Sequence, residues 1–590
     1  MQIYKSFFLF FCLTISLKLV YSQNYGACDH VPNSDNFQYR LGNGLGYIGN
    51  GWDDARMSNL SSKAGYDGQR KKLPEQHLDY WGYGIELGDA QTNTKLGILD
   101  VVGYLATPLL NHSSNATDNP ELCYPANLYK PIFLNNGSVN PENFWANYVY
   151  KTVSTYKDHI KIWETWNEPD YTRNHDQVSN WMTEPPEKSI LTHWYGTIFE
   201  YIRLIRITYE VAKKVDPDCF VTAGGLGYPE FLDAILRYTD NPDGGKVTSD
   251  FPYKGGAYFD CDAYHQYPQY GVTDLETGDG YHENGSDMLA KKVVMLKKNH
   301  EYILKQHGFD GVMFPKKIFV NTETGLNSEK NNNAIGGDLV RRNWILKLAL
   351  FCIQYDVKQT HMLILADDGK GSGDFSNLGQ FKSIEEGFTH LKSSSRGRLV
   401  LQKIHFGKFV YEEVKTKEFL ETLPSGTTGI VLKRKFSKEE GEEYYSEYIY
   451  SAWIYCEKEE VEGEIEYNLN LSFDPLLLDW KGNQQNIKKN SKIKLKAIKP
   501  HSNSKKRKQI SLSNKKNKNN KNINLNKLGV LFDYQIGKKT DIDYFYCHHC
   551  KQRKPAEFSI KCKSSLTEKK YSQRPFKSFI VNGTTIIRSK

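Results

Sequence analysis

Residues 160–170 read Ile-Lys-Ile-Trp-Glu-Thr-Trp-Asn-Glu-Pro-Asp, and this stretch decides how the rest of the chain is interpreted. Its first part, Ile160–Asn167, is rich in β-branched and aromatic side chains, which favours a β-strand. Pro169 has no backbone N–H and cannot continue a hydrogen-bonded ladder, so the strand must end before it. Glu168 is therefore expected at the carboxyl end of a strand.

Similar β-rich segments lie on both sides of this strand, and amphipathic helical stretches separate them. Strands alternating with helices are typical of a parallel sheet. The predicted helices include Asp54–Lys63, Thr197–Val215 and Arg341–Gln354. The predicted strands are, in chain order, Tyr39–Gly49, Gly68–Leu73, Leu96–Ala106, Ile160–Asn167, Phe220–Gly225, Tyr258–Tyr267, Lys317–Glu323 and Met362–Ala366.

Eight such strands with their helices, within residues 33–395, predict an α/β fold of the (β/α)8 TIM-barrel type. A doubly wound open sheet is the competing fold. It is disfavoured because no G-x-G-x-x-G turn follows the first strand. Residues 396–500 lose the helical pattern, and their alternating Ile-, Tyr- and Val-rich runs predict a small antiparallel β-sandwich.

Side chains at the carboxyl ends of barrel strands meet on one open face, where TIM-barrel active sites lie. Cleavage of a glycosidic bond needs two carboxylates there, because one protonates the leaving oxygen and the other acts at the anomeric carbon. Glu168 and Glu323 end the fourth and seventh strands and match this need. The chemistry-bearing residues at these strand ends are Arg70, Asn167, Glu168, His265, Tyr267 and Glu323.

The pattern W-x-x-W-N-E-P-D at residues 163–170 resembles the acid/base signature of the retaining glycoside hydrolases with paired glutamates. Within that clan it is most similar to glycoside hydrolase family 39, which includes β-xylosidases and α-L-iduronidases. Residues 318–325, which contain Glu323, resemble the nucleophile strand of the clan. The resemblance implies that Glu168 is the acid/base, that Glu323 is the nucleophile, and that Asn167 binds the sugar 2-hydroxyl.

The resemblance also implies roles for residues around the nucleophile. Arg70 would pair with Glu323, and His265 with a tyrosine would end strand six. Tyr267, rather than Tyr264, is predicted to hold the nucleophile carboxylate. Aromatic side chains that could stack on sugar rings, or equally belong to the core, are Trp166, Tyr171, Trp181 and Trp194, and of these Trp166 is predicted to bind substrate.

The sequence departs from the clan in two places. No histidine is evident at the end of strand three, and the predicted eighth strand ends in Ala366-Asp367-Asp368-Gly369 without the tryptophan that many members have. These departures concern substrate contacts more than the reaction itself. No cofactor or metal is expected.

The two glutamates should differ in pKa. Arg70 and a tyrosine hydroxyl should keep Glu323 ionised, whereas aromatic neighbours should raise the pKa of Glu168 so that it donates a proton. Carboxyl groups about 5–5.5 Å apart would predict retention of the anomeric configuration, and about 6.5–9.5 Å inversion.

The first 22 residues predict export. Lys5 precedes the apolar run Phe7–Leu17, and Val20 and Ser22 are small residues suited to signal cleavage after Ser22. The apolar run is too short to span a membrane as a helix. We therefore expect a secreted protein, extracellular or in the endomembrane lumen. The candidate N-glycosylation sites agree with this and are Asn59, Asn111, Asn115, Asn136, Asn284 and Asn470.

The net charge of +8 divides unequally along the chain. Residues 501–590 hold 22 Lys and Arg against 5 Asp and Glu, so a basic tail follows an acidic body. Within the tail, residues 501–529 form a Lys/Asn-rich linker that is too polar to order itself, and residues 530–590 contain Cys and His. Cys547, Cys550 and Cys562 resemble part of a zinc-finger site. A second C-x2-C is missing, so a complete site is not expected, although His548 or His549 could serve as a fourth ligand.

The predicted function is a secreted retaining glycosidase whose partner is an oligo- or polysaccharide, with a β-xyloside-like or uronic-acid-containing glycoside implied by the family. An endo-acting β-glucanase and a catalytically inactive carbohydrate-binding barrel are the alternatives. Nucleic acid is expected as a partner only if the basic tail is a genuine domain. A nuclear DNA-binding protein would require that the export signal be spurious.

Overall fold

The computed structural model describes the chain in segments. They are residues 38–44, 54–114, 124–329, 335–367, 375, 377–382, 391–392, 394–395, 408–435 and 446–458, together with short strands within residues 463–588. The predicted signal peptide, Cys28, Cys123, Cys550, Cys562 and nearly all of the linker lie outside these residues. The chain forms two units. The first comprises Met1–Asn284, Met288–Arg341 and Tyr355–Lys392, and the second comprises Gly285–Asp287, Arg342–Gln354 and Ser393–Lys590.

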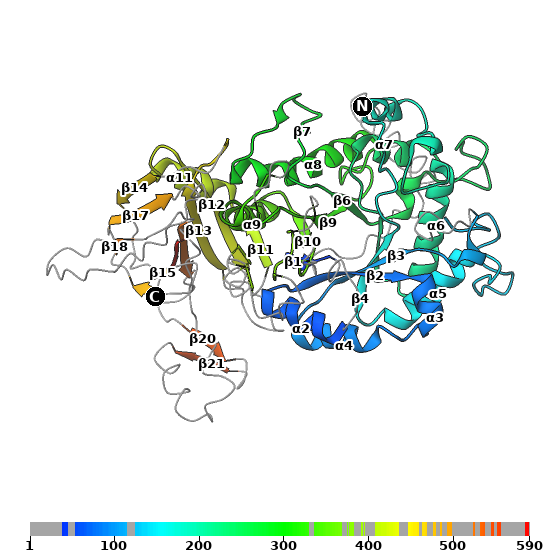
Figure 1. Cartoon of the computed structure of the whole chain (residues 1–590), viewed down its shortest axis with the longest axis horizontal. Helices are drawn as coiled ribbons and strands as arrows, with labels where there is room; N and C mark the ends of the chain where they lie inside the picture. Colours follow the sequence, from blue (N-terminus) through cyan, green and yellow to red (C-terminus); the bar gives the residue numbers. More distant parts are fainter. Residues whose placement is uncertain are drawn as a thin grey trace, which may run out of the picture. The chain divides into compact units, whose positions relative to one another are not determined.

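Eight parallel strands close into a barrel, which confirms the predicted fold class and excludes the open sheet (Figure 1). The order around the barrel is β1-β10-β9-β6-β5-β4-β3-β2, and β1 pairs with both β10 and β2. The strands are β1 (Arg40–Asn43), β2 (Gly68–Pro74), β3 (Val101–Ala106), β4 (Ile160–Thr165), β5 (Phe220–Ala223), β6 (Cys261–His265), β9 (Ile318–Thr324) and β10 (Val357–Met362).

Seven of these strands lie within their predicted segments or share most of their residues with them, but the eighth shares only Met362 with the segment predicted for it. The prediction of Met362–Ala366 was wrong because it followed the apolar residues, and β10 ends at Met362. Most of β10 is polar yet buried. Gln359 donates to the backbone oxygen of Asp100, and the His361 ring fills the space that the missing side chain of Gly42 leaves on β1.

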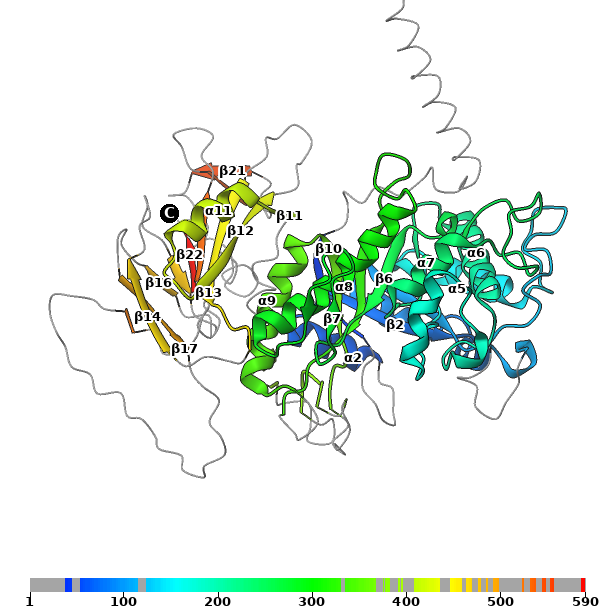
Figure 2. The same cartoon turned by 90° about the horizontal axis from the view of Figure 1, so that it is seen from above.

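Helices cover the outside of the barrel (Figures 1 and 2). They include α2 (Asp54–Ala64), α3 (Glu75–Trp81), α4 (Leu87–Leu96), α5 (Phe144–Tyr156), α6 (Ile198–Val215), α7 (Pro229–Arg237) and α8 (Ser286–Gln306). Helix α9 (Asp338–Gln354) belongs for the most part to the second unit. Helix α6 begins at a capping box, in which Thr197 and Glu200 satisfy each other's backbone N–H groups. Figure 2 shows α5 and α6 side by side, as Figure 1 does.

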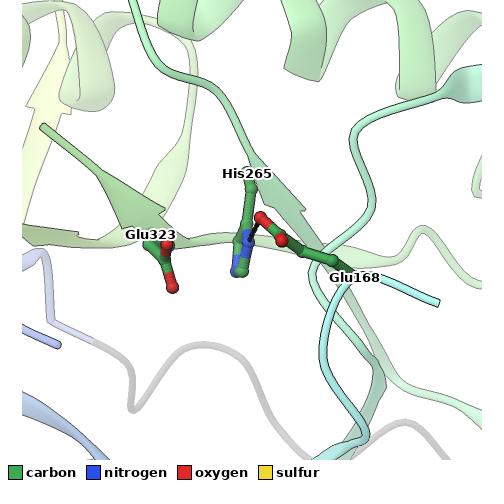
Figure 3. A group of neighbouring side chains, drawn as sticks. All are labelled: Glu168, His265 and Glu323. Carbon is green, nitrogen blue, oxygen red and sulfur yellow. Dashed lines mark hydrogen bonds and ion pairs between the residues drawn. The ribbon is translucent and has the colours of Figure 1, made fainter. Parts of the chain in front are cut away.

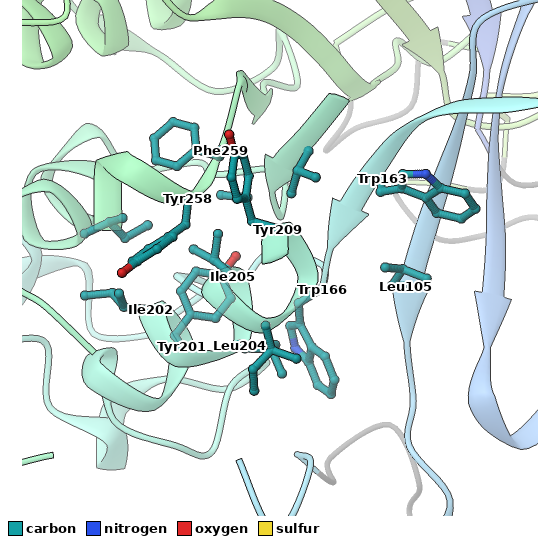
Figure 4. Close-up of a cluster of buried hydrophobic side chains, with 14 of the residues drawn as sticks. Leu105, Trp163, Trp166, Tyr201, Ile202, Leu204, Ile205, Tyr209, Tyr258 and Phe259 are labelled. Atoms are coloured by element: carbon teal, nitrogen blue, oxygen red, sulfur yellow. The ribbon is translucent and has the colours of Figure 1, made fainter. Parts of the chain in front are cut away.

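The core has two layers, one on each side of the strands. Inside the barrel, Val102, Ile162 and Val320 belong to a small cluster of side chains from β3, β4, β5, β6 and β9. Between strands and helices lies a larger cluster in which Tyr201 and Tyr209 of α6 pack with other apolar side chains (Figure 4). Alternate residues of each strand therefore point inward and outward, as the pleat requires.

The second unit contains mainly antiparallel sheets, in agreement with the predicted β-rich region after the barrel. Its largest sheet has the order β11-β12-β13-β19-β22, with helix α11 (Glu413–Thr422) beside it. These strands are β11 (Lys408–Tyr411), β12 (Thr427–Lys435), β13 (Ser446–Ile454), β19 (Leu531–Ile536) and β22 (Thr585–Arg588). Strands β19 and β22 come from residues 530–590, so this part of the predicted tail pairs with the same sheet.

Among the described residues, no helix is long and apolar enough to cross a membrane. Four cysteines of the described chain are buried thiols outside any disulfide: Cys219, Cys261, Cys352 and Cys456. Asn59, Asn111, Asn136 and Asn284, the predicted glycosylation sites within the described segments, are all exposed.

Candidate active site

Charged side chains from four strands meet at the carboxyl end of the barrel. Arg70 comes from β2, Glu164 from β4, His265 is the last residue of β6, and Glu323 is the second-last residue of β9. Glu168 joins them from the loop after β4. Figure 3 shows the His265 ring between the carboxylates of Glu168 and Glu323.

Glu323 receives a hydrogen bond at each carboxylate oxygen. The Tyr267 hydroxyl donates to Oε1, and the Arg70 guanidinium donates to Oε2 at 3.1 Å. Burial and the charge of Glu323 raise the pKa of Tyr267 well above its ordinary value, so its hydroxyl remains a donor. The predicted neighbours of the second glutamate, Arg70 and Tyr267, are therefore both in contact with it.

Arg70 bonds carboxylates from two strands, Glu164 of β4 and Glu323 of β9. Its three nitrogens donate separately to Glu164, Glu323 and Asn167, the last at 2.7 Å. Burial alone would lower the pKa of Arg70, but the charges of Glu164 and Glu323 raise it, so the guanidinium stays charged. The same group lies 4.6 Å from the ring centroid of Tyr104 on β3. Arg70 thus holds Glu323 and Asn167 in fixed positions.

The loop after β4 turns sharply to present Glu168. Trp166 and Glu168 both have left-handed backbone conformations, with φ of 72° and 44°. Such conformations are uncommon for side chains of this size and are found where the surrounding structure holds them, often at functional sites. Here Trp166 is anchored by bonds from its backbone N–H to Leu105 and from its ring N–H to His193.

Glu168 lies between two histidines. His265 Nδ1 is 2.9 Å from its Oε1, and His193 Nδ1 is 3.4 Å from its Oε2. The predicted rise in the pKa of Glu168 is wrong for this arrangement. Burial does raise that pKa, but His193 and His265 outweigh it and lower the pKa below its usual range. Sequence reasoning missed the cause because it placed only aromatic neighbours around Glu168.

A chain of hydrogen bonds determines which nitrogen of His265 donates. Thr322 Oγ1 donates to Glu164 Oε1 at 2.7 Å, because the Glu164 carboxylate, bonded by Arg70 and by the N–H of Gly225, can only accept. Thr322 Oγ1 must then accept from His265 Nε2, 3.0 Å away. His265 Nδ1 and Glu168 Oε1 consequently share one proton: either imidazolium faces carboxylate, or neutral imidazole faces carboxylic acid.

Within the described part of the chain, Glu168, His265 and Glu323 are the one group of His, Cys, Asp and Glu close enough to hold a metal ion. One ligand atom from each lies within 4.8 Å of the others. An ion would compete there with the Arg70 guanidinium, which already bonds Glu323. We therefore interpret the group as a pair of facing carboxylates rather than as a cation site.

Three residues of this site were not predicted: Glu164, Thr322 and His193. Thr322 directly precedes Glu323, Glu164 lies two residues before Trp166, and both are fully buried. A signal was present for them, because inward-facing polar residues on barrel strands need partners. His193 lies in a loop without a pattern, and nothing in the sequence indicated it.

The aromatic side chains divide between the core and the site. Trp166 was predicted to bind substrate, but it is 5% exposed and packs edge-on against Trp194 in the core, which does not support a stacking role. Trp181 is buried as well. Tyr171 is exposed and stacks on His193 at 4.5 Å, beside Glu168.

Of the proposed zinc ligands, Cys547 is the last residue of strand β20 (Tyr544–Cys547), which pairs with β21 (Gln552–Pro555). Cys550 and Cys562 lie outside the described residues. The zinc site and any binding of nucleic acid by the tail stay predictions.

Comparison with known proteins finds solved structures that align with this chain at low sequence identity. No protein-family model and no curated protein sequence matches the chain. A xylanase of glycoside hydrolase family 30 subfamily 8 from Clostridium acetobutylicum aligns over 79% of this chain and 96% of its own, with a TM-score of 0.43 and 13% identity. The catalytic domain of a family 30 xylanase from Talaromyces cellulolyticus aligns over 80% and 99%, with a TM-score of 0.42 and 11% identity.

A β-glucuronidase from Bifidobacterium dentium aligns over 63% of this chain and 47% of its own, with a TM-score of 0.35 and 11% identity. At these TM-scores no residue role is carried over from any of these proteins. The roles proposed below are derived from the site itself.

Proposed function

We propose that this protein is a retaining glycoside hydrolase in which Glu168 is the acid/base and Glu323 the nucleophile. The observation that carries the proposal is the pair of carboxylates facing each other at the carboxyl end of the barrel, with an oxygen of each within 4.8 Å. This distance is nearer to the about 5–5.5 Å carboxyl separation of retaining enzymes than to the about 6.5–9.5 Å of inverting ones.

The contacts of Glu323 suit a nucleophile. Arg70 and Tyr267 donate to its two oxygens and hold the carboxylate in one orientation. Attack on the anomeric carbon forms a glycosyl ester and breaks the bond to the leaving oxygen. Asn167, fixed by Arg70, is suited to bond a hydroxyl of the same sugar.

The proton that Glu168 and His265 share is the one transferred to the leaving oxygen. The charges of Glu323 and Glu168 raise the pKa of His265, although burial lowers it. As the bond from Glu323 to the anomeric carbon forms, the charge of Glu323 is lost and the proton passes from His265 to Glu168. Glu168 turns and protonates the leaving oxygen while the bond from that oxygen to the sugar breaks. Glu168 then takes a proton from water, and the resulting hydroxide attacks the ester and frees Glu323.

The test is hydrolysis of aryl glycosides by matched variants. We expect Glu323→Gln to abolish turnover, and a 2-fluoroglycoside to label Glu323 in the parent protein. Glu168→Gln should lose about 10²–10⁴-fold on substrates with poor leaving groups, lose far less on dinitrophenyl glycosides, and recover with azide to give a glycosyl azide of retained configuration. Unchanged turnover in Glu323→Gln would remove it from the nucleophile role.

One observation favours the alternative of a carbohydrate-binding barrel without turnover. The two histidines keep Glu168 ionised in the absence of substrate, and an ionised carboxylate cannot donate a proton. Binding of a glycan without any product, in both the parent protein and Glu323→Gln, would support this alternative.

The finer substrate class and the location also remain proposals. A β-xyloside-like or uronic-acid-containing glycoside follows from the resemblance at residues 163–170, and glycan substrates suit the site. Export is supported by the signal-like first 22 residues and by the exposed asparagines of four glycosylation triplets. Mass loss on treatment of the secreted protein with an N-glycosidase would test it.

A further inference from the structure

A cavity of about 700 Å³ opens at the carboxyl ends of β2 and β3. Pro74, the last residue of β2, and Thr107, which follows the last residue of β3, both line it. The cavity therefore lies on the same end of the barrel as Glu168 and Glu323. Its lining is completed by Lys72, Gln76, His77, Asp79, Tyr80, Trp81 and Leu109.

The cavity is linked to Glu323 through Tyr104 and Arg70, since Arg70 bonds Glu323 and lies over the Tyr104 ring. Arg70 and Lys72 lie on the same face of β2, and both approach the ring of Tyr104, at 4.6 and 5.9 Å from its centroid. Tyr104 in turn pairs with Glu164 across β3 and β4. Two residues along a strand span about 6.6 Å, which is comparable to the length of one pyranose unit. A chain of sugars that starts beside Arg70 would reach the cavity at its next unit.

Two aromatic side chains stand at the cavity with most of their surface in solvent. Tyr80 is 77% and Trp81 62% exposed, at the end of α3, and their rings meet edge to face at 4.8 Å. Most other tryptophans of the described barrel are buried, including Trp145, Trp163 and Trp194. Exposed rings beside polar groups are suited to a ligand that is apolar on one face and polar at its edge.

We propose that this cavity binds a second, neutral sugar unit of the substrate, so that the protein acts on oligosaccharides in preference to single glycosides. The inference rests on the proposed function. The C–H face of a pyranose would pack on Trp81, and its hydroxyls would bond Lys72, Gln76 or Asp79. Because Lys72 and Asp79 carry opposite charges, the lining has no excess of positive charge for a uronic acid at this position.

The experiment compares aryl β-monoglycosides with the corresponding β-1,4-linked aryl diglycosides of xylose and glucose. We expect the parent protein to prefer a diglycoside. Trp81→Ala should lower kcat/KM for that diglycoside about tenfold and leave the monoglycoside unchanged. Tyr150→Ala removes an exposed ring of α5 that lies outside the cavity and is the matched control. Equal effects of Trp81→Ala on both substrates, or none on either, would overturn the proposal.

Binding is measured separately from turnover. Xylohexaose and cellohexaose are titrated by calorimetry into Glu323→Gln and into the same variant carrying Trp81→Ala. Weaker binding in the second protein supports the cavity as a subsite, and equal affinity, or no binding of either probe, contradicts it. Absence of hydrolysis by the parent protein with binding intact would count against the proposed function alone.

Discussion

Thr322 and Glu164 do not contact the proposed reacting atoms. Their hydrogen bonds nevertheless determine which nitrogen of His265 carries the proton that is shared with Glu168. Their hydrogen bonds oblige His265 Nε2 to donate, so the proton between Nδ1 and Glu168 is the one that titrates. The raised pKa of His265 implies that activity should persist above its ordinary value of 6.5 and fall when the shared proton is lost.

Thr322→Val tests this relay. The variant keeps the shape of the side chain but removes the acceptor of His265 Nε2, which destabilises the imidazolium and lowers its pKa. We expect the alkaline limb of the kcat/KM profile to move to lower pH, with kcat reduced about 10–100-fold. Thr322→Ser should restore both. An alkaline limb unchanged in the valine variant would mean that Thr322 serves packing only.

Gly225 allows the His265 ring to lie against the backbone after β5. A Cβ at this position would come within 2.0 Å of His265 Nε2. We expect Gly225→Ala to displace the ring, to lower activity at least 100-fold, and to cost about 1–3 kcal/mol of stability. Gly227→Ala is the control, since its Cβ would meet only Asp170, at 3.9 Å. Equal activity of the two variants would show that the ring position does not matter.

At the scale of elements, Asp170 ties the loop after β4 to the start of α7. Its Oδ2 accepts from the N–H groups of Gly227 and Tyr228, at 2.7 and 2.8 Å. Burial, and then the charge of Glu168, raise the pKa of Asp170 to about 7, although those two N–H groups oppose the shift. The folded protein therefore binds this proton more tightly than the unfolded chain does.

The consequence is a loss of stability as pH rises. Because the folded pKa of about 7 exceeds the ordinary 3.8, unfolding free energy should fall between about pH 4 and pH 7. Asp170→Asn keeps an acceptor for both N–H groups without the charge. We expect it to be more stable than the parent above pH 7, by at most about 4 kcal/mol, and equally stable near pH 4. The unfolding free energy is measured by denaturant titration across this pH range, with the exposed Asp158→Asn as the control variant. An unfolding free energy of the parent protein that does not fall between pH 4 and pH 7 would contradict the interpretation.

At the scale of the whole molecule, the second unit has a polar centre of its own. Asp287 is fully buried and accepts from Lys347 Nζ, from the Trp453 ring N–H and from the backbone of Cys456, at 2.6, 2.6 and 2.7 Å. These groups come from α8, from α9 and from the end of the sheet. A single carboxylate thus joins segments of the unit that are far apart in sequence.

Removal of that carboxylate should destabilise the unit. Asp287→Ala would leave the Lys347 ammonium buried without its charge partner, at a cost of about 3–5 kcal/mol. Glu413→Ala breaks the exposed pair with Lys417 on α11 and should cost less than about 1 kcal/mol. Calorimetric melting of both variants provides the comparison, and similar transitions in the two would contradict a structural role for Asp287.

The sequence by itself determined the barrel fold and the places of the two glutamates at strand ends, because both follow from patterns of neighbouring residues. Alternating strand and helix patterns predict a parallel sheet, and Pro169 stops β4 where Glu168 follows. Arg70, His265, Tyr267 and Glu323 could be predicted because each lies at or near a strand end, and those ends meet on one face of any such barrel.

Only the tertiary structure decided the position of β10, the core location of Trp166, and the roles suggested for Glu164, Thr322 and His193. Each of these depends on burial or on partners distant in the chain, as in the unpredicted bond between Thr322 and Glu164 across 158 residues. A pattern of residue types cannot supply this information, since whether a polar group is buried, and which proton it holds, depends on what the folded chain brings beside it.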